Sequence, residues 1–152
     1  MRHLASRGLL FVLAAFLAVT AIAGAVFVVP GLPLGWLEGG PFTDYTIPAF
    51  ALGLVGGLAV LTLLALIVRP EVAGVIAVVA GFAMVAFEIV EIAVVGFALA
   101  EYGAAEPVAW LQVVYIAIGL ATMGIGAALW SVTAEDRRRR SRTGHDPVSL
   151  HL

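Results

Sequence analysis

Residues 47–99 of the chain read IPAFALGLVGGLAVLTLLALIVRPEVAGVIAVVAGFAMVAFEIVEIAVVGFAL. The stretch contains two apolar runs, Ile47–Val68 and Val72–Leu99, which only three residues separate. Each run exceeds the roughly 18 apolar residues that indicate a transmembrane helix. Pro70 suits the first turn of a new helix, and Glu71 lies near the positive end of that helix's dipole. The stretch therefore predicts a tight antiparallel hairpin of two membrane-spanning helices.

Two more apolar runs flank this hairpin, Leu9–Val29 before it and about Val108–Val132 after it. The chain is 62% hydrophobic and 12% charged, with a mean hydropathy of +1.11. Soluble domains are roughly 45–50% apolar and about 25% charged, so the composition excludes a soluble globular protein. We predict an all-α fold, a four-helix transmembrane bundle over residues 1–133. Residues 134–152 are expected to form a disordered basic tail.

The positions of the basic residues predict the orientation of the bundle. Arg2 and Arg7 precede the first run and Arg69 lies between the second and third. Five arginines follow the last run: Arg137, Arg138, Arg139, Arg140 and Arg142. All eight fall on one side of a four-span arrangement, so the positive-inside rule places both termini in the cytoplasm. A signal peptide cleaved after Ala21-Ile22-Ala23 is the alternative for the first run, which at 21 residues is longer than a signal core.

Aromatic residues mark the predicted membrane boundaries. Trp36, Tyr102 and Trp110 fall at the outer interface and Trp130 at the inner one. The outer loop Pro30–Thr46 is rich in proline, glycine and aromatic residues rather than polar ones. We expect it to fold against the outer mouth of the bundle.

Small residues at helical spacing indicate close helix packing. The second run contains Gly53-x-x-x-Gly57, and the last run contains Gly119, Gly124 and Gly126. Packing within one bundle is the favoured interpretation, and a homo-oligomer is the alternative.

Several kinds of chemistry are excluded by composition. The chain has no cysteine, which excludes disulfides, thiolate metal sites and cysteine nucleophiles. His3, His145 and His151 all lie in the terminal tails, so no haem is held between histidines within the bundle. We expect no metal and no cofactor.

Two acids in the third run are the strongest candidates for a functional site. Glu88 and Glu91 are three residues apart, which places them on one face of a helix with Cβ atoms roughly 5–6 Å apart. Counting from Val72, Glu88 falls near the middle of the membrane or slightly beyond it. Acids at such depth are costly and face the bundle interior. Because two ionised carboxylates would repel, we expect at least one to be protonated near neutral pH. Interhelical hydrogen bonding is the purely structural alternative.

Polar residues of the last run are candidate partners for this acid pair. Gln112, Tyr115, Gly119 and Thr122 form one stripe, and Gln112 and Tyr115 fall near the depth of Glu91. Thr20 in the first run lies near the middle of the membrane. These side chains are expected to converge in an outward-facing polar pocket or, alternatively, to form a hydrogen-bonded helix seam.

The most distinctive local motif is Pro41-Phe42-Thr43-Asp44-Tyr45-Thr46-Ile47-Pro48. Asp44 or Thr46 can cap the following helix, and Asp44 is also a candidate for the pocket entrance. With four spans and a basic tail, this motif resembles small actinobacterial-type membrane proteins of the loosely DoxX-like kind. The resemblance implies a four-span fold in the bacterial plasma membrane and no defined activity. The chain differs from the small multidrug transporters, another four-helix family. Those proteins carry their glutamate in the first span, whereas the first span here contains no acidic residue.

These features favour one function over two others. We interpret the chain as a proton- or cation-coupled binding or transport module that uses the glutamate pair. The alternative is an accessory or assembly subunit of a larger membrane complex, and an intramembrane enzyme is least favoured. The tail arginines are candidate contacts for anionic lipid, and nucleic-acid binding is not expected.

Overall fold

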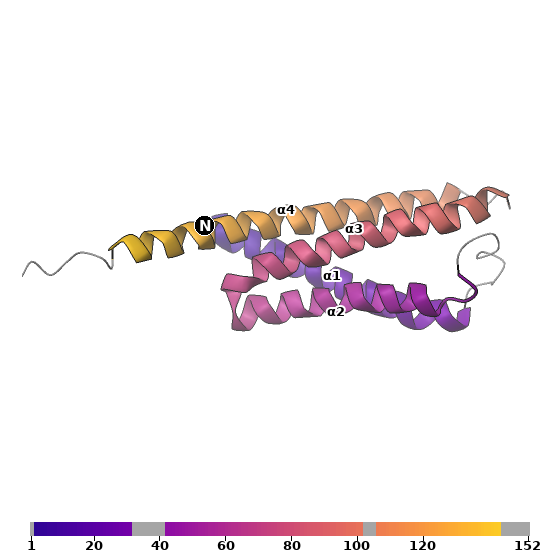
Figure 1. Ribbon diagram of the computed structural model, residues 1–152, viewed down its shortest axis with the longest axis horizontal. Helices are drawn as coiled ribbons and strands as arrows, with labels where there is room; N and C mark the ends of the chain where they lie inside the picture. Colours follow the sequence, from indigo (N-terminus) through magenta and orange to yellow (C-terminus); the bar gives the residue numbers. More distant parts are fainter. Residues whose placement is uncertain (1, 32–41, 102–105, 144–152) are drawn as a thin grey trace, which may run out of the picture.

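The computed structural model describes residues 2–31, 42–101 and 106–143 of the chain (Figure 1). In these residues the only regular secondary structure is helical. Helix α1 is Arg2–Gly31, α2 is Thr46–Val68, α3 is Pro70–Glu101 and α4 is Glu106–Thr143. The predicted all-α fold with four helices is therefore confirmed. The predicted fold of the Pro30–Thr46 loop cannot be followed, because residues 32–41 lie outside the described part.

Each helix contains a segment that is long and apolar enough to cross a membrane. The four segments are Leu4–Phe27, Thr46–Val68, Pro70–Ala93 and Trp110–Glu135. They lie close to the predicted spans. The disordered tail predicted from residue 134 is wrong for its first part, because α4 continues without a break to Thr143.

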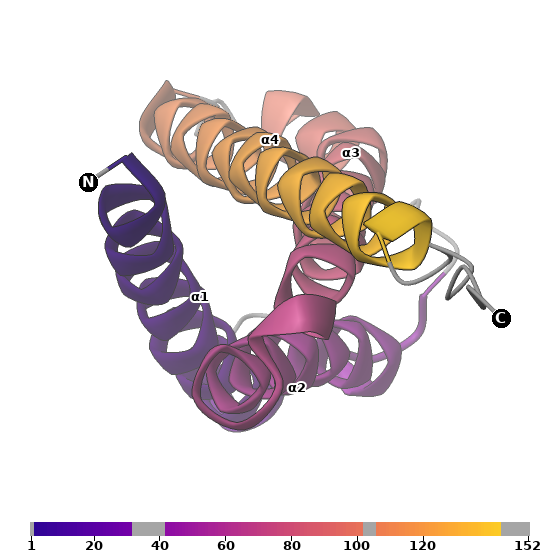
Figure 2. The same ribbon diagram turned by 90° about the vertical axis from the view of Figure 1, so that its left-hand side faces the viewer.

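The helices form two layers that lie against each other. Helix α1 packs chiefly on α2, α3 packs chiefly on α4, and α2 joins the layers by packing on α3 (Figure 2). Helix α1 touches α4 over a much smaller area. The beginning of α1, the α2–α3 connection and the end of α4 lie at the same end of the bundle (Figure 1). This end carries the arginines, and we call it the basic end. The opposite end, where α2 begins and α3 ends, is the acidic end.

A single residue, Arg69, connects α2 to α3. The proline that follows disfavours a helical conformation at Arg69, whose φ and ψ are −142° and 70°. The Arg69 N–H donates to the Ala65 carbonyl at 2.8 Å, and the Val72 N–H donates to the Arg69 carbonyl at 3.0 Å. Pro70 lacks an N–H and begins α3 at no loss of a hydrogen bond. This is the tight hairpin that the sequence predicts.

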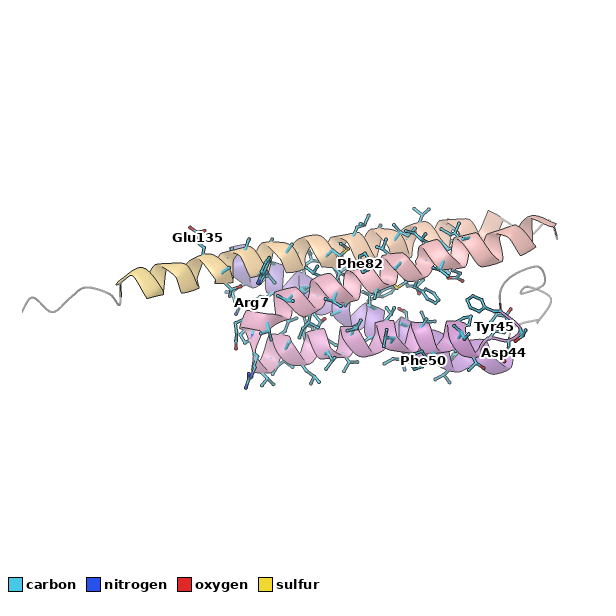
Figure 3. All side chains as sticks on the ribbon, viewed as in Figure 1. Arg7, Asp44, Tyr45, Phe50, Phe82 and Glu135 are labelled. Atoms are coloured by element: carbon cyan, nitrogen blue, oxygen red, sulfur yellow. The ribbon has the colours of Figure 1, made fainter. Side chains whose placement is uncertain are left out.

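The bundle has small residues inside and large apolar residues outside. Most of the buried apolar positions are alanines, such as Ala14, Ala59 and Ala77. Phenylalanine, leucine and valine side chains point outward, for example Phe50, which is 74% exposed (Figure 3). In water, such a surface would be an aggregation site. In lipid it is the expected arrangement, because small residues let helix backbones approach closely.

Helices α3 and α4 touch backbone to backbone at two glycine pairs. A Cβ atom on Gly74 would lie 2.6 Å from the Gly126 carbonyl oxygen, and one on Gly126 would lie 2.7 Å from the Gly74 oxygen. A Cβ atom on Gly119 would lie 3.0 Å from the Gly81 carbonyl oxygen. No side chain larger than hydrogen fits at these contacts. The two pairs are seven residues apart on both helices, and they define what we call the α3–α4 seam.

Two tryptophans of α4 mark the apolar thickness of the bundle. Trp110 and Trp130 are 62% and 53% exposed. They are 20 residues apart in the sequence, which is about 30 Å along a helix. This distance matches the hydrocarbon core of a bilayer, roughly 30 Å thick.

Candidate functional site

Glu88 is a buried acid at the end of a buried alanine stripe on α3. The stripe consists of Ala73, Ala77, Ala80 and Met84, each at most 2% exposed, and Glu88 follows it at 3%. The Glu88 Oε2 atom is buried and has no hydrogen-bond partner in the structure. The helix period that buries the alanines thus also buries a carboxyl group, as the sequence predicted from the cost of an acid in lipid.

Gln112 faces the turn of α3 that carries both acids. Gly126 lies against Gly74 and Ala77, and Gly119 lies against Gly81 and Met84, so the next step of seven residues sets Gln112 against the turn from Glu88 to Glu91. Gln112 is also buried, with an exposure of 8%.

Glu91 is half-buried rather than buried. It lies one turn closer to the acidic end than Glu88, on the same side of α3. The two acids therefore differ in environment, and Glu88 is the one that the bundle encloses.

The acid pair lies in the half of the α3 candidate span that is nearer the acidic end. That span is Pro70–Ala93, and Glu88 is its nineteenth residue. On α4, Gln112 is two residues, or about 3 Å, inside Trp110. The position of Glu88 near the middle of the membrane or slightly beyond it stays a prediction.

Glu88 has few titratable neighbours. The segments of α1, α2 and α4 that could cross a membrane contain Arg7, Tyr115 and Glu135 as their only titratable side chains. Arg7 and Glu135 both lie toward the basic end (Figure 3). Glu71, at the start of α3, is about 26 Å from Glu88 along the helix. Charge compensation by a basic side chain at the level of Glu88 is therefore not seen among the described residues.

The remaining polar stripe of α4 serves packing, with Tyr115 half-buried and Thr122 buried. Tyr115 contacts Phe16 of α1, with ring centroids 6.1 Å apart and an interplanar angle of 33°. Thr122 is 1% exposed, and its hydroxyl donates to the Ile118 carbonyl at 2.8 Å. On α1, the Thr20 hydroxyl donates to the Phe16 carbonyl at 2.8 Å. Thr20 and Thr122 thus direct their hydroxyl protons to their own helices.

One buried polar residue was not predicted. Thr62 of α2 is fully buried, and its hydroxyl donates to the Leu58 carbonyl at 2.9 Å. It is the only polar side chain between Ile47 and Val68, which was the available signal. Gly74 was also missed, although it lies seven residues before Gly81.

Asp44 helps to begin α2 at the acidic end. Its Oδ1 atom accepts a hydrogen bond from the Thr46 N–H at 2.9 Å. The next residue, Tyr45, is 5% exposed, and burial raises the pKa of its phenol above the ordinary value of 10.0. The Tyr45 carbonyl accepts the Ala49 N–H at 2.9 Å. The N-cap position of α2 is Tyr45, without a side-chain cap hydrogen bond, so the prediction that Asp44 or Thr46 caps this helix is wrong. Asp44 is exposed and accepts only the N–H of the first helical residue.

The arginines predicted to contact lipid lie on the last turns of α4. Arg137, Arg138, Arg139, Arg140 and Arg142 all fall within the helix that ends at Thr143. These turns project beyond the other three helices at the basic end (Figure 1).

Among the described residues, no group of three or more His, Cys, Asp or Glu side chains could hold a metal ion. Comparison with protein-family models, curated proteins and solved structures finds no match to this chain. The resemblance to DoxX-like proteins therefore gains no support, and the functional argument depends on the geometry alone.

Proposed function

We propose that the chain is a small proton-coupled transport module in which Glu88 takes up and releases one proton within the helix bundle. The observation that carries the proposal is the buried Glu88 Oε2 atom, which has no hydrogen-bond partner. An ionised acid costs about 2.5–3.5 kcal/mol at the centre of a membrane-spanning helix on insertion scales, and this value is an upper limit for Glu88, which lies toward the acidic end of its span. A bound proton removes this cost, and its release into water near the membrane boundary restores the charge.

The proton is favoured over a metal cation by the shortage of oxygen ligands. Mg²⁺ and Ca²⁺ take six or more oxygen atoms. At the level of Glu88, the α3–α4 seam offers the Glu88 carboxyl group and the Gln112 amide, and the backbone carbonyls of both helices accept helical hydrogen bonds. Glu91 is half-buried one turn away. A proton needs only one oxygen atom, so it suits this site.

The orientation follows from the basic end. Because cytoplasmic segments carry an excess of arginine, we place the basic end and both termini in the cytoplasm, in the plasma membrane of a bacterium. Glu88 then lies near the external face and exchanges its proton with that side. The arginine-bearing turns of α4 lie where they meet anionic lipid head groups, at about 1 kcal/mol per arginine.

Purified protein in liposomes provides the test of this function. A pH-sensitive dye inside the vesicles reports proton movement when a membrane potential is imposed. We expect proton movement with the wild-type chain, loss of that movement with Glu88→Gln, and no change with Glu71→Gln. Glu71 is the matched control, because it is an exposed acid of the same helix. A wild-type chain that moves no protons, or a Glu88→Gln variant that moves as many, would overturn the proposal.

The alternative, an accessory subunit of a larger complex, makes a different prediction. It requires a stable partner that co-purifies in fixed stoichiometry from the native membrane. It also predicts that Glu88→Gln changes the amount of assembled complex rather than any proton movement.

A further inference from the structure

The α3–α4 seam changes its chemistry at its third step. Its first two steps pair glycines, Gly74 with Gly126 and Gly81 with Gly119. Its third step sets Gln112 against the turn of α3 from Glu88 to Glu91, and Glu88 and Gln112 are both at most 8% exposed. Two long polar side chains thus take the place of a glycine pair in a seam that is otherwise closed by backbone contact.

The chemistry of the two side chains is complementary only when Glu88 holds a proton. A protonated carboxyl group has one O–H donor and one carbonyl acceptor, and a glutamine amide has an oxygen acceptor and an N–H donor. The other two buried polar side chains, Thr62 and Thr122, donate their hydroxyls to carbonyls of their own helices. Gln112 is the buried amide that the facing helix α4 offers to Glu88.

We propose that Gln112 is the positioning residue for the Glu88 proton and forms an acid–amide pair with Glu88 across the α3–α4 seam. The Glu88 Oε2 atom has no hydrogen-bond partner in the structure, so the pair forms when the two side chains rotate toward each other. The Glu88 O–H then donates to the Gln112 amide oxygen, and the Gln112 N–H donates to the Glu88 carbonyl oxygen. When the proton leaves, Glu88 has only acceptors, so the amide oxygen loses its donor and the amide group reorients. This inference rests on the proposed function of Glu88. It identifies Gln112 as the group whose hydrogen bonds change when Glu88 gains or loses its proton.

Other titratable groups near this pair are few. Glu91 lies one turn away on α3, and Tyr115 lies three residues from Gln112 on α4. The membrane-spanning segment of α2 has no titratable side chain, and that of α1 has only Arg7, toward the basic end (Figure 3). Tyr45, directly before the α2 segment, is buried at the acidic end, and its pKa is raised above 10.0 by burial, so it stays neutral over the range in which an acid titrates. A pH-dependent signal from Gln112 therefore reports Glu88, with Glu91 as the acid that a control variant must exclude.

The sequence allows this pair to be observed without a mutation. Gln112 is the only glutamine, and the chain has no asparagine. In protein labelled with ¹⁵N-glutamine, one side-chain amide pair in the NMR spectrum belongs to Gln112. We expect its resonances to shift with pH, with the same midpoint as the infrared carboxyl band that Glu88→Gln removes. Glu88→Leu should abolish the shift, and Glu91→Leu should preserve it.

A second measurement remains available if Glu88→Leu does not fold. Gln112→Met keeps the length of the side chain and removes its hydrogen bonds, so the infrared band of protonated Glu88 should move to higher wavenumber. Thr122→Val, a buried polar-to-apolar change on the same face of α4, should leave that band in place.

The outcomes separate the inference from the function. If the Glu88 carboxyl band titrates while the Gln112 amide and the Gln112→Met spectrum stay unchanged, the pair is overturned and the proton function stands. If no Glu88 carboxyl band titrates at all, both the proposed proton function and the proposed acid–amide pair are overturned.

Discussion

Gly74 of α3 and Gly126 of α4 meet so closely that a Cβ atom on either would lie within 2.7 Å of the other's carbonyl oxygen. Together with Gly81 and Gly119, this contact fixes the register of the two helices. The register is what brings a buried acid on α3 level with a buried amide on α4. The seam thus connects the packing of the bundle to its candidate site.

Alanine at Gly126 is predicted to destabilise the bundle. The added methyl group would lie 2.7 Å from the Gly74 oxygen and 2.9 Å from the Ala77 Cβ atom, so the helices must separate. Overpacking of this kind costs about 1–3 kcal/mol. The free energy of unfolding in mixed micelles measures the effect.

Gly124→Ala is the matched control on the same helix. A Cβ atom on Gly124 would have no atom within 4 Å, so the change should be neutral or stabilise α4 by up to about 1 kcal/mol. Equal destabilisation by both variants would contradict the seam.

Labelling of single cysteines should report the topology, because the chain has no cysteine that must first be removed. We expect Thr43→Cys, at the acidic end, to react with a membrane-impermeant maleimide in intact cells. Ser141→Cys, near the end of α4, should react only after the membrane is opened. Reaction of both in intact cells, or the reverse pattern, would refute the proposed orientation.

Alkaline pH is predicted to destabilise the bundle through Tyr45. Burial raises the pKa of this phenol above 10.0, so the neutral form is favoured in the folded state. Its contribution to stability is complete below pH 10 and is lost as the pH rises through the raised value. Thermal unfolding in detergent should show a weaker decline at high pH for Tyr45→Phe. An unchanged decline would assign the effect to other groups.

Depth-dependent quenching should place the two tryptophans of α4 at opposite boundaries. In a Trp36→Phe background, Trp110 and Trp130 should both be quenched most strongly by lipids brominated near the head group. Strongest quenching by lipids brominated at the chain ends would show that the helix is tilted or shifted away from the position inferred from its exposed tryptophans.

Much of the fold could be predicted from the sequence, because lipid imposes strong limits on length and polarity. The four helices and the hairpin at Arg69 follow from apolar run lengths and from Pro70. The register of α3 against α4 could not be predicted, since glycines on one helix do not specify their partners on another. For this reason the sequence named Gln112 only as a candidate partner of the acid pair, near the depth of Glu91.

The end of α4 was mispredicted for a different reason. A run of arginines was interpreted as a solvated, disordered tail, although arginine is a good helix former. Residues 132–143 contain no glycine or proline, and Glu135 and Asp136 each lie four residues before an arginine. This spacing supports a helix on its own.

The central claim is that Glu88 holds a proton inside the bundle, and infrared titration of the carboxyl bands tests it most directly. At neutral pH the wild-type protein should show a protonated carboxyl band that is absent in Glu88→Gln and present in Glu71→Gln. Glu88→Gln should still fold, because an amide resembles a protonated acid in shape and hydrogen-bonding reach. A spectrum in which Glu88 is fully ionised at neutral pH, with no such band to lose, would contradict the account.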